Sequence, residues 1–328
     1  MSKKFLVTGA AGFIASQVCS QLLDQGDQVV GVDNLNDYYD VRLKEWRLEL
    51  LKNHPKSQNF YFEKLDIENQ EGLKALFKNQ GAFDAVLNLA ARAGVRYSME
   101  NPHVYLSTNA EGTLNLLQCM LENGCKKFVL ASTSSLYAGQ NMPFTEDLAV
   151  NEPLSPYAAS KKAGELMAYS YYKLYQMDVS VVRYFTVFGP AGRPDMSPYR
   201  FIKWIAEGET IQMFGDGSQS RDFTFVDDIA RGTIAAIENV GYEIINLGGG
   251  RNPVSLNKII EKLETLIGKK AVIDHKPFHI ADLMETWADI EKAKKLLGWG
   301  PKVSLDEGLE KSVSWYMENR EWLKEVQV

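Results

Sequence analysis

The chain has 328 residues, of which 45% are hydrophobic and 24% charged, a composition typical of a globular protein of one or two domains. A formal net charge of -6 provides no basic surface for nucleic acid or an anionic membrane, so we expect neither as a partner. No apolar run approaches the roughly 18 residues of a membrane-spanning helix. Three cysteines and four histidines, without metal-ligand spacing, predict no metal site and no disulfide framework. We therefore expect a protein of the reducing cytoplasm, with buried thiols and no signal peptide.

Short apolar runs alternate with helix-like segments through the first two-thirds of the chain. We expect strands at residues 5–7, 28–32, 60–62, 85–87, 128–130 and 179–182, and helices at 14–23, 70–79, 104–123 and 157–175. Strands that are almost continuously apolar, separated by helices, indicate a buried parallel sheet with helices on both faces. The fold class predicted is therefore α/β, a Rossmann-like doubly wound sheet whose ligands bind at the carboxyl ends of the strands.

The pattern changes after Gly189. Residues 189–194 resemble a loop and 215–218 a turn, with helices expected at 201–207 and 256–267 and a further strand at 244–247. We interpret this region as a smaller C-terminal substrate-binding domain. The predicted division is a dinucleotide-binding domain of residues 1–187 and 225–252 and a substrate domain of residues 188–224 and 253–328.

A glycine-rich segment joins the first expected strand to the first helix. Its spacing, G-x-x-G-x-x-A from Gly9 to Ala15, is a variant of the dinucleotide fingerprint in which alanine replaces the last glycine. Such a loop lets the backbone approach a pyrophosphate at a helix N-terminus, where N–H groups and the helix dipole favour anions. Asp33 ends the second strand, and a carboxylate there accepts hydrogen bonds from the adenosine ribose and repels a 2′-phosphate. We therefore predict NAD rather than NADP, the alternative being a plain glycine turn with a capping aspartate.

Further cofactor contacts are expected where the next strands end. Asp66 and Ile67 follow the third strand and would meet the adenine, whereas Leu89, Ala90 and Ala91 follow the fourth and leave room near the pyrophosphate. A simple strand end is the alternative for each. With the loop, the expected cofactor contacts are Gly9, Gly12, Phe13, Ile14, Asp33, Asn34, Asp66, Ile67, Leu89, Ala90 and Ala91.

Tyr157 and Lys161 lie four residues apart on one expected helix, which places both side chains on the same face. An unperturbed tyrosine has a pKa of about 10, and a nearby ammonium favours the phenolate. The pair therefore predicts a base that removes a proton from an alcohol. A structural tyrosine–lysine pair is the alternative, and the glycine loop upstream argues against it.

These segments together resemble the extended short-chain dehydrogenase/reductases, in particular the NAD-dependent nucleotide-sugar epimerases, and most closely the UDP-glucuronate 4-epimerases. The resemblance runs nearly end to end and rests on residues 8–15, 33–39, 93–98, 157–161, 183–186, 189–196 and 221–223. It implies reversible epimerisation at C4 of a UDP-sugar through a 4-keto intermediate, with NAD regenerated in each turnover. It also implies that Lys161 and Tyr184 contact the cofactor and that helices 104–123 and 157–175 form a homodimer.

The resemblance places the family's catalytic hydroxyl at Thr133, which would bridge the sugar O4 and share its proton with Tyr157. Ser134, a further expected substrate contact, and Ser135 stand where related 4,6-dehydratases have Asp and Glu and where UDP-glucuronate decarboxylases have Glu at the second position. Hydroxyls cannot replace those acid/base groups at neutral pH, which argues against both reactions. Leu136 and Ala138 depart from the family's usual Val and Gly.

The resemblance assigns substrate recognition mainly to cations. Arg221 corresponds to the family's diphosphate-binding arginine, and bidentate phosphate contact suits arginine. Arg193 and Thr186 correspond to the pair that holds the sugar carboxylate, the alternative for Arg193 being a solvated loop residue paired with an aspartate. Arg96 is a second candidate for the sugar or phosphate, and Asp282 completes the expected substrate contacts. His279 replaces a family arginine near Asp282, and the small Thr286 does not exclude an N-acetyl sugar.

The sequence leaves several functions open. The first is epimerisation of UDP-glucuronate to UDP-galacturonate. The second is a 4-epimerase of UDP-glucose/galactose or of a UDP-N-acetylhexosamine. A UDP-glucuronate decarboxylase and a non-catalytic NAD-binding protein are less favoured, the latter because the Thr, Tyr and Lys of the reaction are all present.

Overall fold

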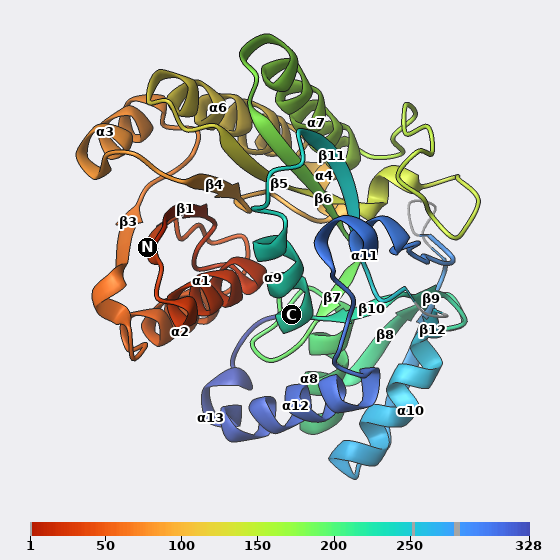
Figure 1. Cartoon of the computed structure of the whole chain (residues 1–328). Helices are drawn as coiled ribbons and strands as arrows, with labels where there is room; N and C mark the ends of the chain where they lie inside the picture. Colours follow the sequence, from red (N-terminus) through yellow and green to blue (C-terminus); the bar gives the residue numbers. More distant parts are fainter. Residues whose placement is uncertain (1, 251–252, 279–282) are drawn as a thin grey trace.

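The computed structural model describes residues 2–250, 253–278 and 283–328. Its centre is a seven-stranded sheet with the order β11-β6-β5-β4-β1-β2-β3, in which every neighbouring pair is parallel (Figure 1). The strands are β1 (Lys4–Thr8), β2 (Gln28–Asp33), β3 (Phe60–Lys64), β4 (Ala85–Asn88), β5 (Lys127–Thr133), β6 (Asp178–Tyr184) and β11 (Tyr242–Leu247). The predicted Rossmann-like sheet is confirmed, including the late strand that returns to its edge.

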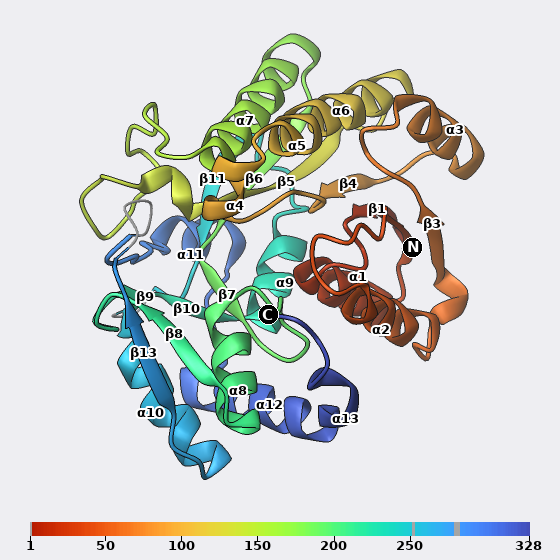
Figure 2. The same ribbon diagram turned by 180° about the vertical axis from the view of Figure 1, so that it is seen from behind.

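Helices cover both faces of this sheet, as Figures 1 and 2 show from opposite sides. On one face α1 (Phe13–Gln25) packs against α2 (Val41–Lys52) and α9 (Val226–Ala235), and on the other α6 (Gly112–Glu122) packs against α3 (Gln70–Gln80) and α7 (Pro156–Tyr175). Successive strand residues point to opposite faces. Consequently Phe5 and Val7 of β1 enter one hydrophobic core and Leu6 enters the other.

The helix expected at residues 104–123 has a wider turn inside it. It consists of α5 (His103–Leu106), a π-helical segment (Ser107–Glu111) and α6. Within that segment the Asn109 side chain accepts from the Arg92 N–H at 2.8 Å and donates to the Arg92 carbonyl and the Ser160 hydroxyl, both at 2.9 Å. Such π-turns recur at functional sites, and here Asn109 ties the loop after β4 to α7.

The C-terminal part contains short paired strands and helices that the sequence analysis mostly missed. The pairs are β7 (Thr186–Phe188) with β10 (Phe223–Phe225), β8 (Thr210–Phe214) with β13 (Val272–Lys276), and β9 (Ser220–Arg221) with β12 (Val254–Ser255). The helices are α8 (Ser197–Glu207), α10 (Leu256–Ile267), α11 (Glu291–Leu297), α12 (Leu305–Glu318) and α13 (Arg320–Leu323). Of these elements only the helices α8 and α10 were predicted. The paired strands were missed because strands of two to five residues carry too little periodicity to identify. Within the described ranges, no helix has both the length and the apolarity to cross a membrane.

Candidate active site

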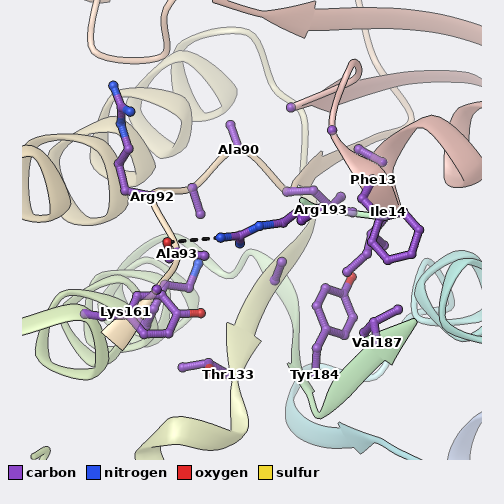
Figure 3. Close-up of a pocket in the computed structure, with 18 of the residues that line it drawn as sticks. Phe13, Ile14, Ala90, Arg92, Ala93, Thr133, Lys161, Tyr184, Val187 and Arg193 are labelled. Carbon is purple, nitrogen blue, oxygen red and sulfur yellow. Dashed lines mark hydrogen bonds between the residues drawn. The ribbon is translucent and has the colours of Figure 1, made fainter. Parts of the chain in front are cut away.

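A cavity of about 450 Å³ opens at the carboxyl ends of β1, β2, β4 and β5, between the sheet and the C-terminal part. Its lining includes the predicted catalytic residues and the whole set of predicted cofactor residues. The predicted site residues that line the cavity are Gly9, Gly12, Phe13, Ile14, Asp33, Asn34, Asp66, Ile67, Leu89, Ala90, Ala91, Thr133, Ser134, Tyr157, Lys161, Tyr184, Thr186, Arg193 and Arg221. Figure 3 shows part of this lining, with Phe13 and Ile14 on one side and Lys161 and Thr133 on another.

The glycine loop is shaped by close backbone approach. Gly9 has a φ of +71°, and a side chain there would place its Cβ 2.9 Å from the Ala90 nitrogen. A Cβ on Gly12 would lie 2.8 Å from the Gly9 carbonyl oxygen, which accepts the Gly12 N–H at 2.7 Å. Only glycine fits both positions. Gly12 is also the N-cap of α1 and has no side-chain cap, so N–H groups of the first turn remain for an anion.

Asp33 shapes the adenosine end of the cavity. One carboxylate oxygen accepts the Ala11 N–H at 3.1 Å and the other accepts the Leu35 N–H at 2.8 Å. Asn34 donates to the carboxylate of Asp66 at 2.6 Å, which links the ends of β2 and β3. The cradle formed by these groups and the glycine loop fits a dinucleotide with a free ribose hydroxyl.

Two cations in the cavity were missed in the sequence analysis. Lys44 of α2 donates to the Asn36 carbonyl at 2.6 Å, and burial lowers the pKa of Lys44 to about 8, with the nearby Asp33 opposing this shift. Arg92 donates to the Asn36 side chain at 3.2 Å, and within the described part of the chain its buried Nε has no hydrogen-bond partner. An incoming phosphate oxygen would satisfy that donor. For Lys44 the available signal was a charged residue on the buried face of the amphipathic segment 41–52.

Thr133, Tyr157 and Lys161 come from β5 and α7. The Thr133 oxygen accepts the Ser135 N–H at 3.1 Å, and Thr133 lines the same cavity as Tyr157. Burial raises the pKa of Tyr157 above its ordinary value, and the groups that oppose this are Thr133 and the Arg193 guanidinium. Burial also lowers the pKa of Lys161 to about 8. Lys161 was expected to lower the pKa of Tyr157, but the groups that lower it are Thr133 and Arg193.

A buried ion pair supports these residues from behind. Arg183 of β6 and Glu165 of α7 are each 1% exposed, and Glu165 also accepts the Ser132 hydroxyl at 2.7 Å. Glu165 lies one helical turn after Lys161, and Ser132 precedes Thr133. The pair therefore fixes α7 to the ends of β5 and β6, where the reacting groups lie.

Arg193 is held in place by several contacts. It donates to both carboxylate oxygens of Asp195, at 3.0 and 2.6 Å, and to the Ala93 carbonyl at 3.3 Å, the bond drawn in Figure 3. Its guanidinium also lies 5.6 Å from the ring centre of Tyr38. The pairing with aspartate that formed the alternative interpretation is present, but the guanidinium is only 21% exposed and lines the cavity.

Two expected substrate contacts, Arg96 and Asp282, are not among the described residues that line the cavity. Arg96 lies outside the cavity lining, with its guanidinium 3.9 Å from the ring centre of Phe214. The sequence could not show this contact, because β8 lies far from residue 96 along the chain. Asp282, like His279, lies outside the described residues. Thr286 lines the cavity, and its buried hydroxyl has no hydrogen-bond partner among the described residues.

The fold, the dinucleotide cradle and the Thr–Tyr–Lys group define an NAD-binding enzyme of the epimerase/dehydratase type. Residues 5–248 match the model of the NAD dependent epimerase/dehydratase family, and the chain belongs to that family. Among its curated relatives is the UDP-glucuronate 4-epimerase of Thermodesulfobacterium geofontis, 61% identical over 324 residues and 99% of each chain.

Solved structures agree in fold over nearly the whole chain. UDP-glucuronic acid 4-epimerase from Bacillus cereus, in complex with UDP-glucuronic acid and NAD, is 38% identical with a TM-score of 0.89, and the match covers 96% of this chain and 99% of that one. UDP-glucose 4-epimerase from Thermotoga maritima, with UDP-glucose, is 32% identical with a TM-score of 0.86, over 97% and 99% of the two chains.

Proposed function

We propose that the protein is a UDP-glucuronate 4-epimerase that interconverts UDP-glucuronate and UDP-galacturonate with tightly held NAD. The observation that carries this proposal is Arg193 in the same cavity as Thr133, Tyr157 and Lys161, with Thr186 beside it in the lining. A neutral sugar requires no guanidinium next to the reacting hydroxyl, whereas a C6 carboxylate pairs with one. The high identity to a UDP-glucuronate 4-epimerase supports the same substrate.

The catalytic residues carry out a reversible oxidation at one carbon. Tyr157, as the phenolate, removes the proton from the sugar O4, and Thr133 holds that oxygen and shares the proton. Bound NAD would accept the hydride from C4 and return it to the opposite face of the same carbon, so that the cofactor ends each turnover oxidised. Thr133 and the Arg193 guanidinium favour the phenolate of Tyr157, and Lys161 would hold the nicotinamide ribose. After the 4-keto sugar has turned about its diphosphate link, Tyr157 returns the proton to O4 on the inverted centre.

The carboxylate creates a side reaction that the site must suppress. A 4-keto glucuronate is a β-keto acid and tends to lose carbon dioxide. Arg193 and Thr186 would hold the carboxylate in an orientation that disfavours this loss, and Ser134 and Ser135 supply no acid/base group for elimination. Arg221 would bind the diphosphate, and Arg96 and Asp282 stay predictions for substrate contact.

We also propose a homodimer that forms through the helical stretch 104–123, which includes α5 and α6, and through α7. Their outward residues include large apolar side chains: Leu106 is 58% exposed, Leu166 54% and Leu174 70%. Burying several such side chains against a second copy is favourable. The division into a cofactor domain (1–187 and 225–252) and a substrate domain (188–224 and 253–328), and the cytoplasmic location, likewise remain proposals.

The test is an assay of each candidate substrate with the purified enzyme and no added NAD. Epimerisation of UDP-glucuronate at least about tenfold faster than that of UDP-glucose or UDP-N-acetylglucosamine is expected, since only the glucuronate offers Arg193 a sugar carboxylate for a charge-assisted hydrogen bond. A preference for UDP-glucose would favour the second candidate, and a UDP-pentose as main product would indicate a decarboxylase.

A further inference from the structure

Arg47 is a buried cation that joins three segments of the chain. It lies in the middle of α2 and is 2% exposed. Its Nη1 donates to the Ala11 carbonyl at 3.1 Å and to the Tyr39 hydroxyl at 2.7 Å. Its Nε and Nη2 donate to the Ala191 carbonyl at 3.0 and 2.7 Å, and Nη2 also donates to the Gly192 carbonyl at 3.2 Å. One side chain therefore connects α2 to the glycine loop and to the loop that follows β7.

The described hydrogen bonds of Arg47 all end on neutral oxygens. By contrast, the buried cations Arg183 and Lys127 each contact a carboxylate, from Glu165 and Asp178 respectively. A buried charge without a counter-charge is unfavourable unless its donors are satisfied. A guanidinium has five N–H donors in one plane, and the five hydrogen bonds of Arg47 use all of them. Lysine has three donors and cannot reproduce this set.

The loop held by Arg47 has a conformation that needs support. Ala191 has a φ of +52°, in the left-handed region that residues with a Cβ rarely adopt. Such a residue persists where surrounding contacts over-determine it, and two donors of Arg47 meet the carbonyl of Ala191. Arg193 follows two residues later and reaches the cavity from this loop.

Arg47 also holds the glycine-rich cofactor loop through the carbonyl of Ala11. The Ala11 N–H is bound by Asp33 and the Ala11 carbonyl by Arg47, so both sides of this residue are fixed. Arg47 therefore sets the position of the loop that carries Arg193 relative to the loop that holds the cofactor. Hydride transfer requires the sugar C4 to lie next to the cofactor. The relative position of the two loops therefore also sets where the sugar C6 carboxylate can lie.

We infer that Arg47 is a positioning residue for substrate selection: by bracing residues 191–192 against the cofactor loop, it holds Arg193 where a sugar carboxylate is recognised. The inference rests on the proposed function. Without the brace, the loop at Ala191 relaxes and Arg193 withdraws from the carboxylate. Affinity for UDP-glucuronate then falls, whereas UDP-glucose has no carboxylate and loses much less.

The experiment compares Arg47→Lys and Arg47→Met with the matched control Arg42→Lys. Arg42 lies on the same helix but is exposed, and it pairs with Asp40 and Glu325 outside the cavity. The dissociation constants of UDP-glucuronate and UDP-glucose are measured by calorimetry on each NAD-loaded variant. The preference for UDP-glucuronate is expected to fall about tenfold or more in both Arg47 variants, in line with the loss of a charge-assisted hydrogen bond, and to stay unchanged in the control.

The outcomes separate this inference from the proposed function. If the wild type does not prefer UDP-glucuronate, the proposed function fails. If the wild type prefers it and folded Arg47→Lys keeps the same ratio, only the role of Arg47 is overturned. Equal losses for both sugars, or failure of both variants to fold, would show that Arg47 serves the fold as a whole and would overturn the inference as well.

Discussion

Arg183 and Glu165 form a forked ion pair one helical turn from Lys161, with Nε–Oε1 and Nη2–Oε2 distances of 2.9 and 2.8 Å. Ser132 donates to the same carboxylate and is followed by Thr133 in the chain. The pair therefore joins β5, β6 and α7 behind the catalytic groups. Because the pair is buried, removing one partner would destabilise the fold, and the intact pair fixes the position of the catalytic groups.

Glu165→Ala is expected to destabilise the protein by about 3–5 kcal/mol, because it leaves the buried Arg183 without its counter-charge. Urea unfolding of the holoenzyme measures this change. Glu71→Ala is the matched control, since Glu71 pairs with Lys74 on an exposed helix face and such pairs contribute about 0–1 kcal/mol. A loss below about 1 kcal/mol in Glu165→Ala would contradict the role assigned to the pair.

Tyr157→Phe removes the base but leaves the ring that packs 6.0 Å from Tyr105. We expect kcat to fall by a factor of about 10²–10⁴ with little change in UDP-sugar affinity. The control is Tyr137→Phe, whose hydroxyl bonds Asn246 away from the cavity lining and which should keep most of its activity. Kinetics and calorimetry of both variants check this, and a Tyr157→Phe enzyme with ordinary kcat would show that another group is the base.

The pH dependence should reflect Lys161. Burial lowers the pKa of Lys161 to about 8, and a lysine is charged below its pKa. Since the charged ammonium would hold the nicotinamide ribose with all three of its N–H groups, kcat is expected to fall as the pH rises through about 8. Lys161→Arg keeps its charge at all these pH values, so its alkaline fall should move to higher pH. If kcat falls over the same alkaline pH range in the wild type and in Lys161→Arg, the fall is caused by the titration of another group.

Arg193→Met should weaken UDP-glucuronate binding about 10- to 100-fold, as expected for the loss of a charge-assisted contact. It should also release a UDP-pentose, because the carboxylate of the 4-keto intermediate is no longer restrained. Binding is measured by calorimetry and products by NMR. Arg193→Ala with intact glucuronate epimerisation and no pentose would refute the carboxylate role.

The dimer proposal is tested on α7. Leu166→Glu with Leu174→Glu places two charges on its exposed apolar face and is expected to convert dimers to monomers in light scattering. Leu266→Glu is the control, because Leu266 is 41% exposed on α10 in the other part of the molecule. A wild-type monomer, or a double variant that stays dimeric, would rule out this interface.

Local patterns sufficed to predict much of the fold and site. Apolar runs located the main strands, glycine spacing located the loop at Gly9, and helical periodicity paired Tyr157 with Lys161. These features are short-range, so the sequence contains them directly. Asp33 was equally readable, since it ends a strand next to that loop.

The remaining features depend on contacts between distant segments. Arg47 and Lys44 look like ordinary charged residues of an amphipathic helix until α2 packs on the glycine loop. The π-helical turn at Asn109 depends on bonds to Arg92 and Ser160, and Arg96 lies against Phe214 of a strand that the sequence did not reveal. Periodicity says which face is buried, but not which partner lies there.

The most direct test of the account uses UDP-glucuronate that carries deuterium at C4, incubated in ordinary water with enzyme and no added NAD. The expected product is UDP-galacturonate that keeps the deuterium at C4, because the hydride leaves and returns to the same carbon while Tyr157 exchanges only the O4 proton. NMR reads both the inversion and the label. An inverted product that has lost the deuterium, or no inversion at all, would contradict reversible oxidation at C4.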